Sequence, residues 1–149
     1  MQIEKKLKSL VKQKKTLLGV GPMSLNCVDA SIELSNKFNV PIILIASRRQ
    51  IDSESLGGGY VNNWTTKNFS NYIKKKDKKK LIILARDHGG PWQNNLEKKL
   101  NLKKAIESCK KSFQSDIDND FNIIHIDTCI DNEKNINFEN AFNRLCGLY

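Results

Sequence analysis

The chain has 149 residues, of which 39% are hydrophobic and 28% are charged, a composition typical of a globular domain and not of a disordered or fibrous protein. No apolar run approaches the roughly 20 residues that span a bilayer, and the charged N-terminal segment lacks the apolar core of a signal peptide. The net charge of +9 comes mainly from lysine, and no nucleic-acid-binding motif is present. We therefore expect a cytoplasmic protein with no nucleic-acid and no membrane partner.

Apolar runs of strand length alternate with segments of helical spacing along the whole chain. The run Pro41–Ala46 is continuous and rich in isoleucine, as in parallel strands that are buried on both faces. Ser24 and either Thr65 or Thr66 are placed to cap the helices that follow them. The predicted elements are a helix over 3–15, a strand over 16–20, a helix over 25–38, a strand over 41–46, a helix ending at 76, a strand over 81–85, a helix over 96–113, a strand over 122–126 and a helix from 138 to 145.

This alternation predicts an α/β fold of parallel βα units with right-handed crossovers, in a single domain over 1–149. Two architectures fit the pattern. One is a small doubly wound sheet that is complete in itself, and the other is the first half of a (β/α)8 barrel, whose usual length is about 250 residues. In both architectures the functional residues belong at the C-terminal ends of the strands.

The most distinctive residues follow the third predicted strand, where Asp87 and His88 precede Gly89 and Gly90. Here a histidine could bind a metal or a phosphate, and an aspartate could transfer a proton or orient its neighbour. Glycines allow backbone N–H groups to approach a phosphate closely. The alternative is a structural turn in which Asp87 and His88 share a hydrogen bond and the glycines serve only the geometry.

Two arginines, Arg48 and Arg49, follow the second predicted strand and suit a phosphate or carboxylate group. The loop continues into three glycines that include Gly58 and Gly59, which could wrap around a ligand. The alternative is that the arginines form ion pairs with nearby acidic residues such as Asp52.

The fourth predicted strand carries His125 and ends at Asp127. A lone histidine in a strand is more often a satisfied core residue, so Asp127 is the better candidate for binding a substrate. The cysteines form no CxxC pair, which argues against a zinc ribbon or a redox motif. We expect them to be reduced and buried; they are Cys27, Cys109, Cys129 and Cys146.

At these positions the sequence resembles the non-catalytic subunit of class II tagatose-bisphosphate aldolase, a (β/α)8-barrel relative of the zinc-dependent ketose-bisphosphate aldolases. The order and spacing of the motifs agree over nearly the whole chain, and the motif after the third strand is the most specific. The matching residues are Gly58-Gly59-Tyr60, Asp87-His88, Gly90-Pro91-Trp92-Gln93 and Ile124-His125-Ile126-Asp127.

The resemblance implies an accessory subunit, or the N-terminal half of one, that stabilises and activates a catalytic aldolase subunit acting on a phosphorylated sugar. It implies that Asp87 is a proton donor and that His88 is a zinc ligand. The chain has only two histidines, whereas a catalytic zinc normally has three protein ligands. Two alternatives remain open: the full-length protein is itself a sugar-phosphate lyase or epimerase, or the chain is an independent doubly wound ligand-binding domain.

Overall fold

The computed structural model describes residues 2–132 and 135–149, which alternate between strands and helices as the sequence predicts. The strands are β1 (Leu18–Val20), β2 (Ile42–Ser47), β3 (Ile82–Gly89) and β4 (Ile123–Ile126). The helices are α1 (Gln2–Lys12), α2 (Leu25–Phe38), α3 (Thr66–Lys76), α4 (Leu102–Asp118) and α5 (Phe138–Leu148), with short 3-10 turns η1 (Glu54–Leu56) and η2 (Asn95–Glu97). The predicted α/β fold of parallel βα units is confirmed.

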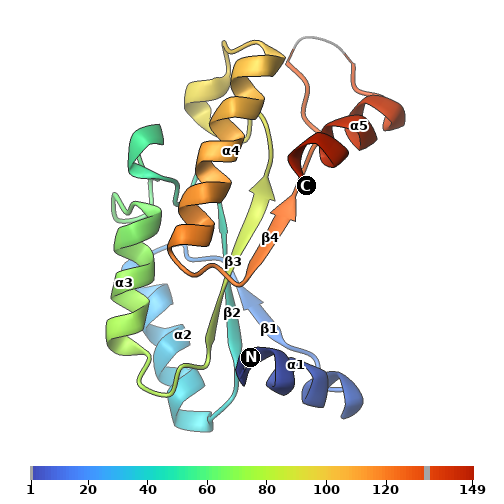
Figure 1. Cartoon of the computed structure of the whole chain (residues 1–149). Coiled ribbons are helices and arrows are strands. Elements are labelled where there is room, and N and C mark those ends of the chain that lie inside the picture. The colour runs from blue at the N-terminus through green and yellow to red at the C-terminus, as the bar shows by residue number, and fades with distance from the viewer. Residues whose placement is uncertain (1, 133–134) are drawn as a thin grey trace.

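The four strands form one parallel sheet in the order β1-β2-β3-β4. Helices α2, α3 and α4 all lie against the same face of this sheet (Figure 1). A doubly wound sheet would place helices on both faces and reverse its strand order at a switch point. The chain is therefore singly wound, and the doubly wound alternative is wrong. Sequential order with helices on one side is also the arrangement of successive units in a (β/α)8 barrel.

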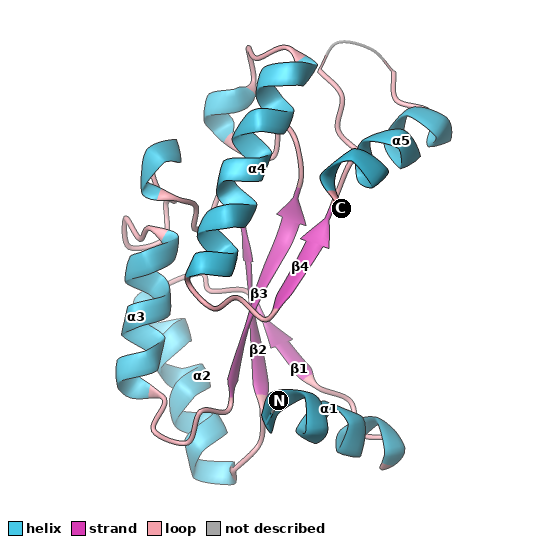
Figure 2. Cartoon of the chain, in the orientation of Figure 1, coloured by secondary structure: helices cyan, strands magenta, loops and turns pink. Residues whose placement is uncertain are grey.

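The hydrophobic core lies between the sheet and these three helices, whose positions are clearest in the view by secondary structure (Figure 2). Alternate residues of β2 are fully buried and partly buried along its length, because successive side chains of a strand point to opposite faces. The buried set faces the helices and joins residues of α2, α3 and β3. Its members include Val28, Ile32, Ile42, Leu44, Ala46, Phe69, Ile73, Ile82 and Leu84.

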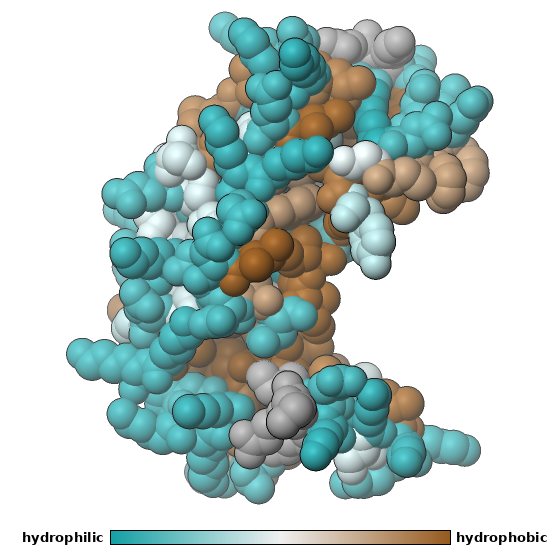
Figure 3. Space-filling view, viewed as in Figure 1, coloured by the Kyte–Doolittle hydropathy of each residue, from teal (hydrophilic) through white to brown (hydrophobic). Residues whose placement is uncertain are grey.

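The opposite face of the sheet is hollow and apolar. Figure 3 shows this hollow as a concave side of the molecule, with hydrophobic side chains gathered along it. Parallel register places Ile43, Ile83 and Ile123 on this face, opposite to the helices, and Ile123 is 39% exposed. In a closed barrel this face would be the packed interior.

The observed elements differ from the predicted ones chiefly around α4. The predicted helix over 96–113 begins instead at Leu102, because the side chain of Asn101 caps it by accepting a hydrogen bond from the backbone N–H of Lys104 at 3.0 Å. Leu96 lies in η2 and is 69% exposed. Phe38, the last residue of α2, is 62% exposed.

The predicted cap at Ser24 is confirmed, and of the two candidates Thr65 and Thr66 it is Thr65 that caps α3; both capping side chains accept N-terminal backbone hydrogen bonds. All four cysteines are free, but only Cys109 is buried, so the burial prediction fails for the other three. Burial raises the pKa of the Cys109 thiol to about 12. Among the helices of the described residues, none has the length and hydrophobicity that crossing a membrane requires.

Strand β3 extends four residues beyond the predicted end at Ala85, and it contains a bulge. Its register with β4 shifts between Arg86, which pairs with Ile124, and Gly89, which pairs with Ile126. The extra residues let the backbone after β3 approach that of β4 very closely. A Cβ atom at Gly90 would lie 1.5 Å from the carbonyl oxygen of Asp127. Gly90 is therefore required by a close contact between two backbones.

We expect Gly90→Ala to lower the free energy of unfolding by about 3 kcal/mol, the upper end of the cost of overpacking, because the opposing atom is backbone and cannot move aside. Urea denaturation followed by circular dichroism measures this loss. Gly147→Ala is the matched control, since nothing lies within 4 Å of its added Cβ, and it should leave the free energy of unfolding unchanged or slightly raised. Equal effects of the two substitutions would contradict the close-contact explanation.

Candidate functional site

Two aspartates and two histidines meet at the C-terminal ends of β3 and β4. Asp87 and His88 come from the bulge of β3, while His125 lies in β4 and Asp127 directly follows it. Bulges beside functional sites redirect side chains that regular pleating would separate. Here the bulge lets the neighbouring residues Asp87 and His88 both reach the same group of side chains. The structure thus brings Asp87 and His88 together with the residues at the end of β4.

His88 is bound to Asp127 through a short hydrogen bond, with 2.8 Å between Nδ1 of the imidazole and Oδ2 of the carboxylate. The same Oδ2 accepts a hydrogen bond from Nε2 of Gln93 at 2.9 Å. The other oxygen, Oδ1, accepts one from the backbone N–H of Cys129 at 3.0 Å. Asp127 thus binds protein groups through both oxygens, in contrast to its predicted role as a substrate contact.

Asp87 lies between the two histidines. Its carboxylate oxygens are 3.5 Å from Nε2 of His88 and 3.5 Å from Nδ1 of His125. The side chains of Asp87, His88 and His125 are 39%, 55% and 59% exposed, so His125 is not a core histidine. A carboxylate and an imidazole that are both accessible and this close can exchange protons with a bound ligand.

The electrostatics of the site favour an ionised Asp127. Burial raises the pKa of its carboxyl, but hydrogen bonds from Cys129 and His88 outweigh burial and hold this pKa below its ordinary value. The same carboxylate acts on Cys129, where the hydrogen bond to Asp127, followed by burial, raises the pKa of the thiol. Cys129 is therefore a poor nucleophile at neutral pH.

An open pocket of about 380 Å³ lies beside this group. Its lining residues come from the ends of β2, β3 and β4, and they are Ser47, Arg49, His88, Gln93, Cys129 and Ile130. Arg49 is exposed and also lines a second pocket of about 300 Å³ next to the glycine-rich loop. A guanidinium at the mouth of a pocket suits an anionic ligand group, so the geometry is compatible with the prediction that Arg49 binds a phosphate.

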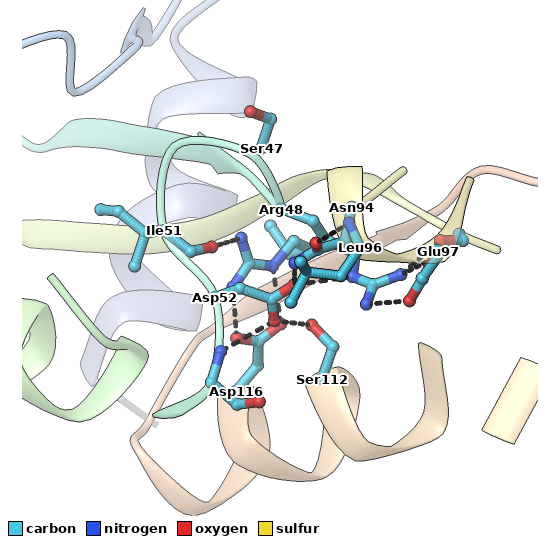
Figure 4. Close-up of polar contacts among 12 residues, drawn as sticks. Ser47, Arg48, Ile51, Asp52, Asn94, Leu96, Glu97, Ser112 and Asp116 are labelled. Atoms are coloured by element: carbon cyan, nitrogen blue, oxygen red, sulfur yellow. Dashed lines mark hydrogen bonds and ion pairs between the residues drawn. The ribbon is translucent and has the colours of Figure 1, made fainter. Parts of the chain in front are cut away.

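Arg48 has a different environment from its neighbour. Its guanidinium is fully buried and donates to Asp52 at 3.1 Å, to both oxygens of Glu97 at 3.0 and 2.6 Å, and to the backbone carbonyl of Gly90 at 2.7 Å (Figure 4). The structure places Arg48 in the interior, so its predicted contact with a phosphate is replaced by the ion pair with Asp52 that was the alternative.

A second buried arginine continues this network. Arg86 of β3 donates to both carboxylate oxygens of Asp116 in α4, at 2.8 and 2.6 Å, and to the backbone carbonyls of Ala46 and Ile51. Burial raises the pKa of the Asp116 carboxyl, and the contact with Arg86 opposes that shift. Figure 4 shows Asp116 and Ser112 of α4 directed toward Asp52 and the loop after β2. The network therefore joins the ends of β2 and β3 to α4.

The glycine-rich loop is shaped by its own hydrogen bonds. The backbone N–H of Gly58 donates to the carbonyl of Ser53, and that of Gly59 donates to the carbonyl of Trp64. Gly58 has a φ of +66°, and a Cβ atom at Gly59 would lie 2.0 Å from the carbonyl oxygen of Gln50. These amides are occupied within the protein, so the predicted phosphate cradle at Gly58 and Gly59 is absent in this arrangement.

The side chains present do not make a complete zinc site. No group of three or more His, Cys, Asp or Glu side chains within residues 2–132 and 135–149 is arranged to hold a metal ion. His88 offers one suitable nitrogen, Nε2, and the carboxylate of Asp127 on its other nitrogen is the usual partner of a metal-bound histidine. One such ligand is too few for the three protein ligands of a catalytic zinc.

Sequence reasoning missed Gln93 and Glu97 as members of these networks. Gln93 holds the carboxylate of Asp127, and Glu97 is 1% exposed and holds Arg48. Gln93 stands in the loop between β3 and η2, and Glu97 is the last residue of η2, in a segment that was predicted to begin the helix over 96–113. The signals in the sequence were the place of Gln93 in the motif after the third strand and the proximity of Glu97 to that motif.

We expect Arg48→Ala to lower the free energy of unfolding by about 3–5 kcal/mol, because it leaves two buried carboxylates without their partner. The adjacent Arg49→Ala is the matched control and should change the free energy of unfolding by less than about 0.5 kcal/mol, since its side chain is exposed. Urea titration of both variants measures the difference. Similar losses in the two variants would mean that the Arg48 network does not stabilise the fold.

The sequence matches no protein-family model and no curated protein. The fold is similar to that of a solved structure described as a probable tagatose 6 phosphate kinase from Sinorhizobium meliloti 1021, with a TM-score of 0.73 and 18% sequence identity. The similarity covers 90% of this chain but 35% of the other protein, so the chain spans about a third of that neighbour's length. At this level of identity the comparison establishes a shared arrangement of βα units.

Proposed function

We propose that the chain is an accessory subunit, or the N-terminal half of one, of a class II ketose-bisphosphate aldolase of the tagatose-bisphosphate type. The observation that carries the proposal is the position of Asp87 and His88. Both stand on the bulge at the C-terminal end of β3, and His88 lines an open pocket there; the C-terminal ends of strands are where βα-barrel proteins place functional residues. The structural neighbour, described as a probable tagatose 6 phosphate kinase, supports a role with phosphorylated sugars.

The pocket has the chemical character that a phosphorylated sugar requires. Arg49 supplies a fixed positive charge at its mouth, and Ser47 and Gln93 supply polar groups beside His88. Arginine binds phosphate well because its planar guanidinium presents paired N–H donors. A sugar hydroxyl or carbonyl would then lie near the imidazole of His88 and the carboxylate of Asp87.

An accessory role is favoured over independent zinc catalysis by the donor set. The sequence has two histidines, and their imidazole rings are 6.4 Å apart between centroids with Asp87 between them. In this proposal the catalytic partner supplies the complete metal site. The chain binds that partner and contributes a pocket for a phosphorylated sugar.

The direct test measures cleavage of tagatose bisphosphate by a purified class II aldolase catalytic subunit with and without this chain. We expect the chain to raise both the rate and the melting temperature of the catalytic subunit, because binding to the native state stabilises it by mass action. Serum albumin at the same concentration is the control for non-specific protection. An unchanged rate and melting temperature at saturating chain would contradict the accessory role.

A second candidate is that the protein itself acts on a sugar phosphate as an acid–base enzyme. The observation in its favour is that the carboxylate of Asp87 and Nε2 of His88 are both accessible and lie 3.5 Å apart. Exchange of substrate protons in D₂O, with added zinc and without a partner, measures this activity. We expect Asp87→Asn to lower any such rate about 100-fold or more, and the exposed Asp118→Asn in α4 to leave it unchanged. If the wild-type chain causes no exchange, this second candidate is wrong.

A further inference from the structure

We propose that Asp127 is a positioning residue that holds His88 as the Nδ1–H tautomer, so that Nε2 is the nitrogen that meets a ligand, and that Gln93 acts through Asp127. The inference rests on the proposed function only for the identity of the ligand, a phosphorylated sugar. The hydrogen-bond geometry carries the rest. It assigns Asp127 a role that differs from the substrate contact predicted for it.

The proton in the contact between His88 and Asp127 belongs to the imidazole ring. An ionised carboxylate can only accept hydrogen bonds, and in a neutral imidazole one nitrogen donates while the other accepts. Because Oδ2 of Asp127 is 2.8 Å from Nδ1 of His88, Nδ1 must carry the proton. Nε2 then carries the lone pair, which can act as a base or bind a cation, and a carboxylate oxygen of Asp87 lies 3.5 Å from it.

Asp127 is itself held in place by two hydrogen bonds. Gln93 donates to Oδ2 at 2.9 Å and the backbone N–H of Cys129 donates to Oδ1 at 3.0 Å. Both side chains are buried, with Asp127 8% and Gln93 5% exposed. A carboxylate that is fixed through both oxygens cannot rotate away from His88, so the tautomer is set by the fold and not by a flexible contact.

The backbone conformation of His88 is also constrained. Its φ of +46° lies in the left-handed region, which residues other than glycine adopt at a cost. Such conformations persist where the surrounding structure enforces them, and they gather at functional sites. Here the bulge of β3 and the bond to Asp127 enforce it, and the result is that the imidazole of His88 reaches the pocket lined by Arg49.

The site therefore has two groups that can recognise a ligand. Arg49 can bind the phosphate of a ligand, and Nε2 of His88 can accept a proton from a hydroxyl group or a carbon acid of the same ligand. Asp87 is 3.5 Å from that Nε2 and lies where it can pass a proton to or from the imidazole. Asp127 touches His88 but does not line the pocket, so its effect on a ligand is indirect.

Nitrogen-15 NMR of histidine-labelled full chain distinguishes the tautomers at a pH where the rings are neutral. We expect the wild-type His88 signals to be those of protonated Nδ1 and unprotonated Nε2. Asp127→Asn should shift the equilibrium toward the Nε2–H tautomer, because the amide no longer requires a donor at Nδ1. Gln93→Ala should give a smaller shift in the same direction. A predominantly Nε2–H tautomer in the wild-type chain would overturn the proposal, and this measurement needs no variant to fold.

Two controls separate positioning from general disruption. Asp127 contacts His88, whereas His125 contacts Asp87, so the His125 signals should stay unchanged in Asp127→Asn. The exposed Asp120→Asn, whose partner is Lys74 in α3, should alter neither histidine. If Asp127→Asn leaves His88 in its wild-type tautomer while the chain remains folded, Asp127 is not a positioning residue.

A full chain labelled with nitrogen-15 in both histidine and arginine distinguishes this inference from the proposed function. Addition of inorganic phosphate and of tagatose bisphosphate should shift the Arg49 side-chain signals, and only the sugar should also shift Nε2 of His88. A confirmed tautomer without any response to the sugar would reject the proposed ligand and leave the positioning role intact. A response to the sugar with the wrong tautomer would reject the positioning role alone.

Discussion

The buried ion-pair network beneath α4 is the constraint on which the candidate site depends. Arg48 and Arg86 are both fully buried, and their carboxylate partners Asp52, Glu97 and Asp116 come from the loop after β2, from η2 and from α4. Buried charges are costly to desolvate and are tolerated only when they are paired and hydrogen-bonded. The bidentate contacts here meet that condition, so this network fixes the C-terminal ends of β2 and β3 relative to one helix.

The network also connects to the bulge that forms the site. Arg48 donates to the backbone carbonyl of Gly90, and Gly90 is the residue whose backbone lies against that of Asp127. The contact between the ends of β3 and β4 is thus held from the helix side by a buried cation and from the other side by the hydrogen bonds of His88 and Gln93 to Asp127. Positioning of the imidazole follows from packing that lies outside the pocket itself.

The hollow face of the sheet carries apolar side chains that no helix of the core covers. Register places Ile43, Ile45 and Ile123 on a face that α2, α3 and α4 do not cover. Burial of such apolar area is the main force in folding. Within the described residues, β1 and β4 are the edge strands of the sheet. The singly wound order explains why this face exists, since a barrel would enclose it with further strands.

The sequence by itself determined the alternation of strands and helices, the cap at Ser24, a cap at Thr65 or Thr66, and the place of Asp87 and His88 at a strand end, because these depend on local periodicity and turn chemistry. It could not separate Arg48 from Arg49: adjacent in sequence, one is buried and the other exposed. It likewise could not show that Gly59 and Gly90 serve close backbone contacts. Only the tertiary structure decided these roles, because each depends on which distant segments meet across the sheet. For the same reason only the tertiary structure excluded the doubly wound alternative.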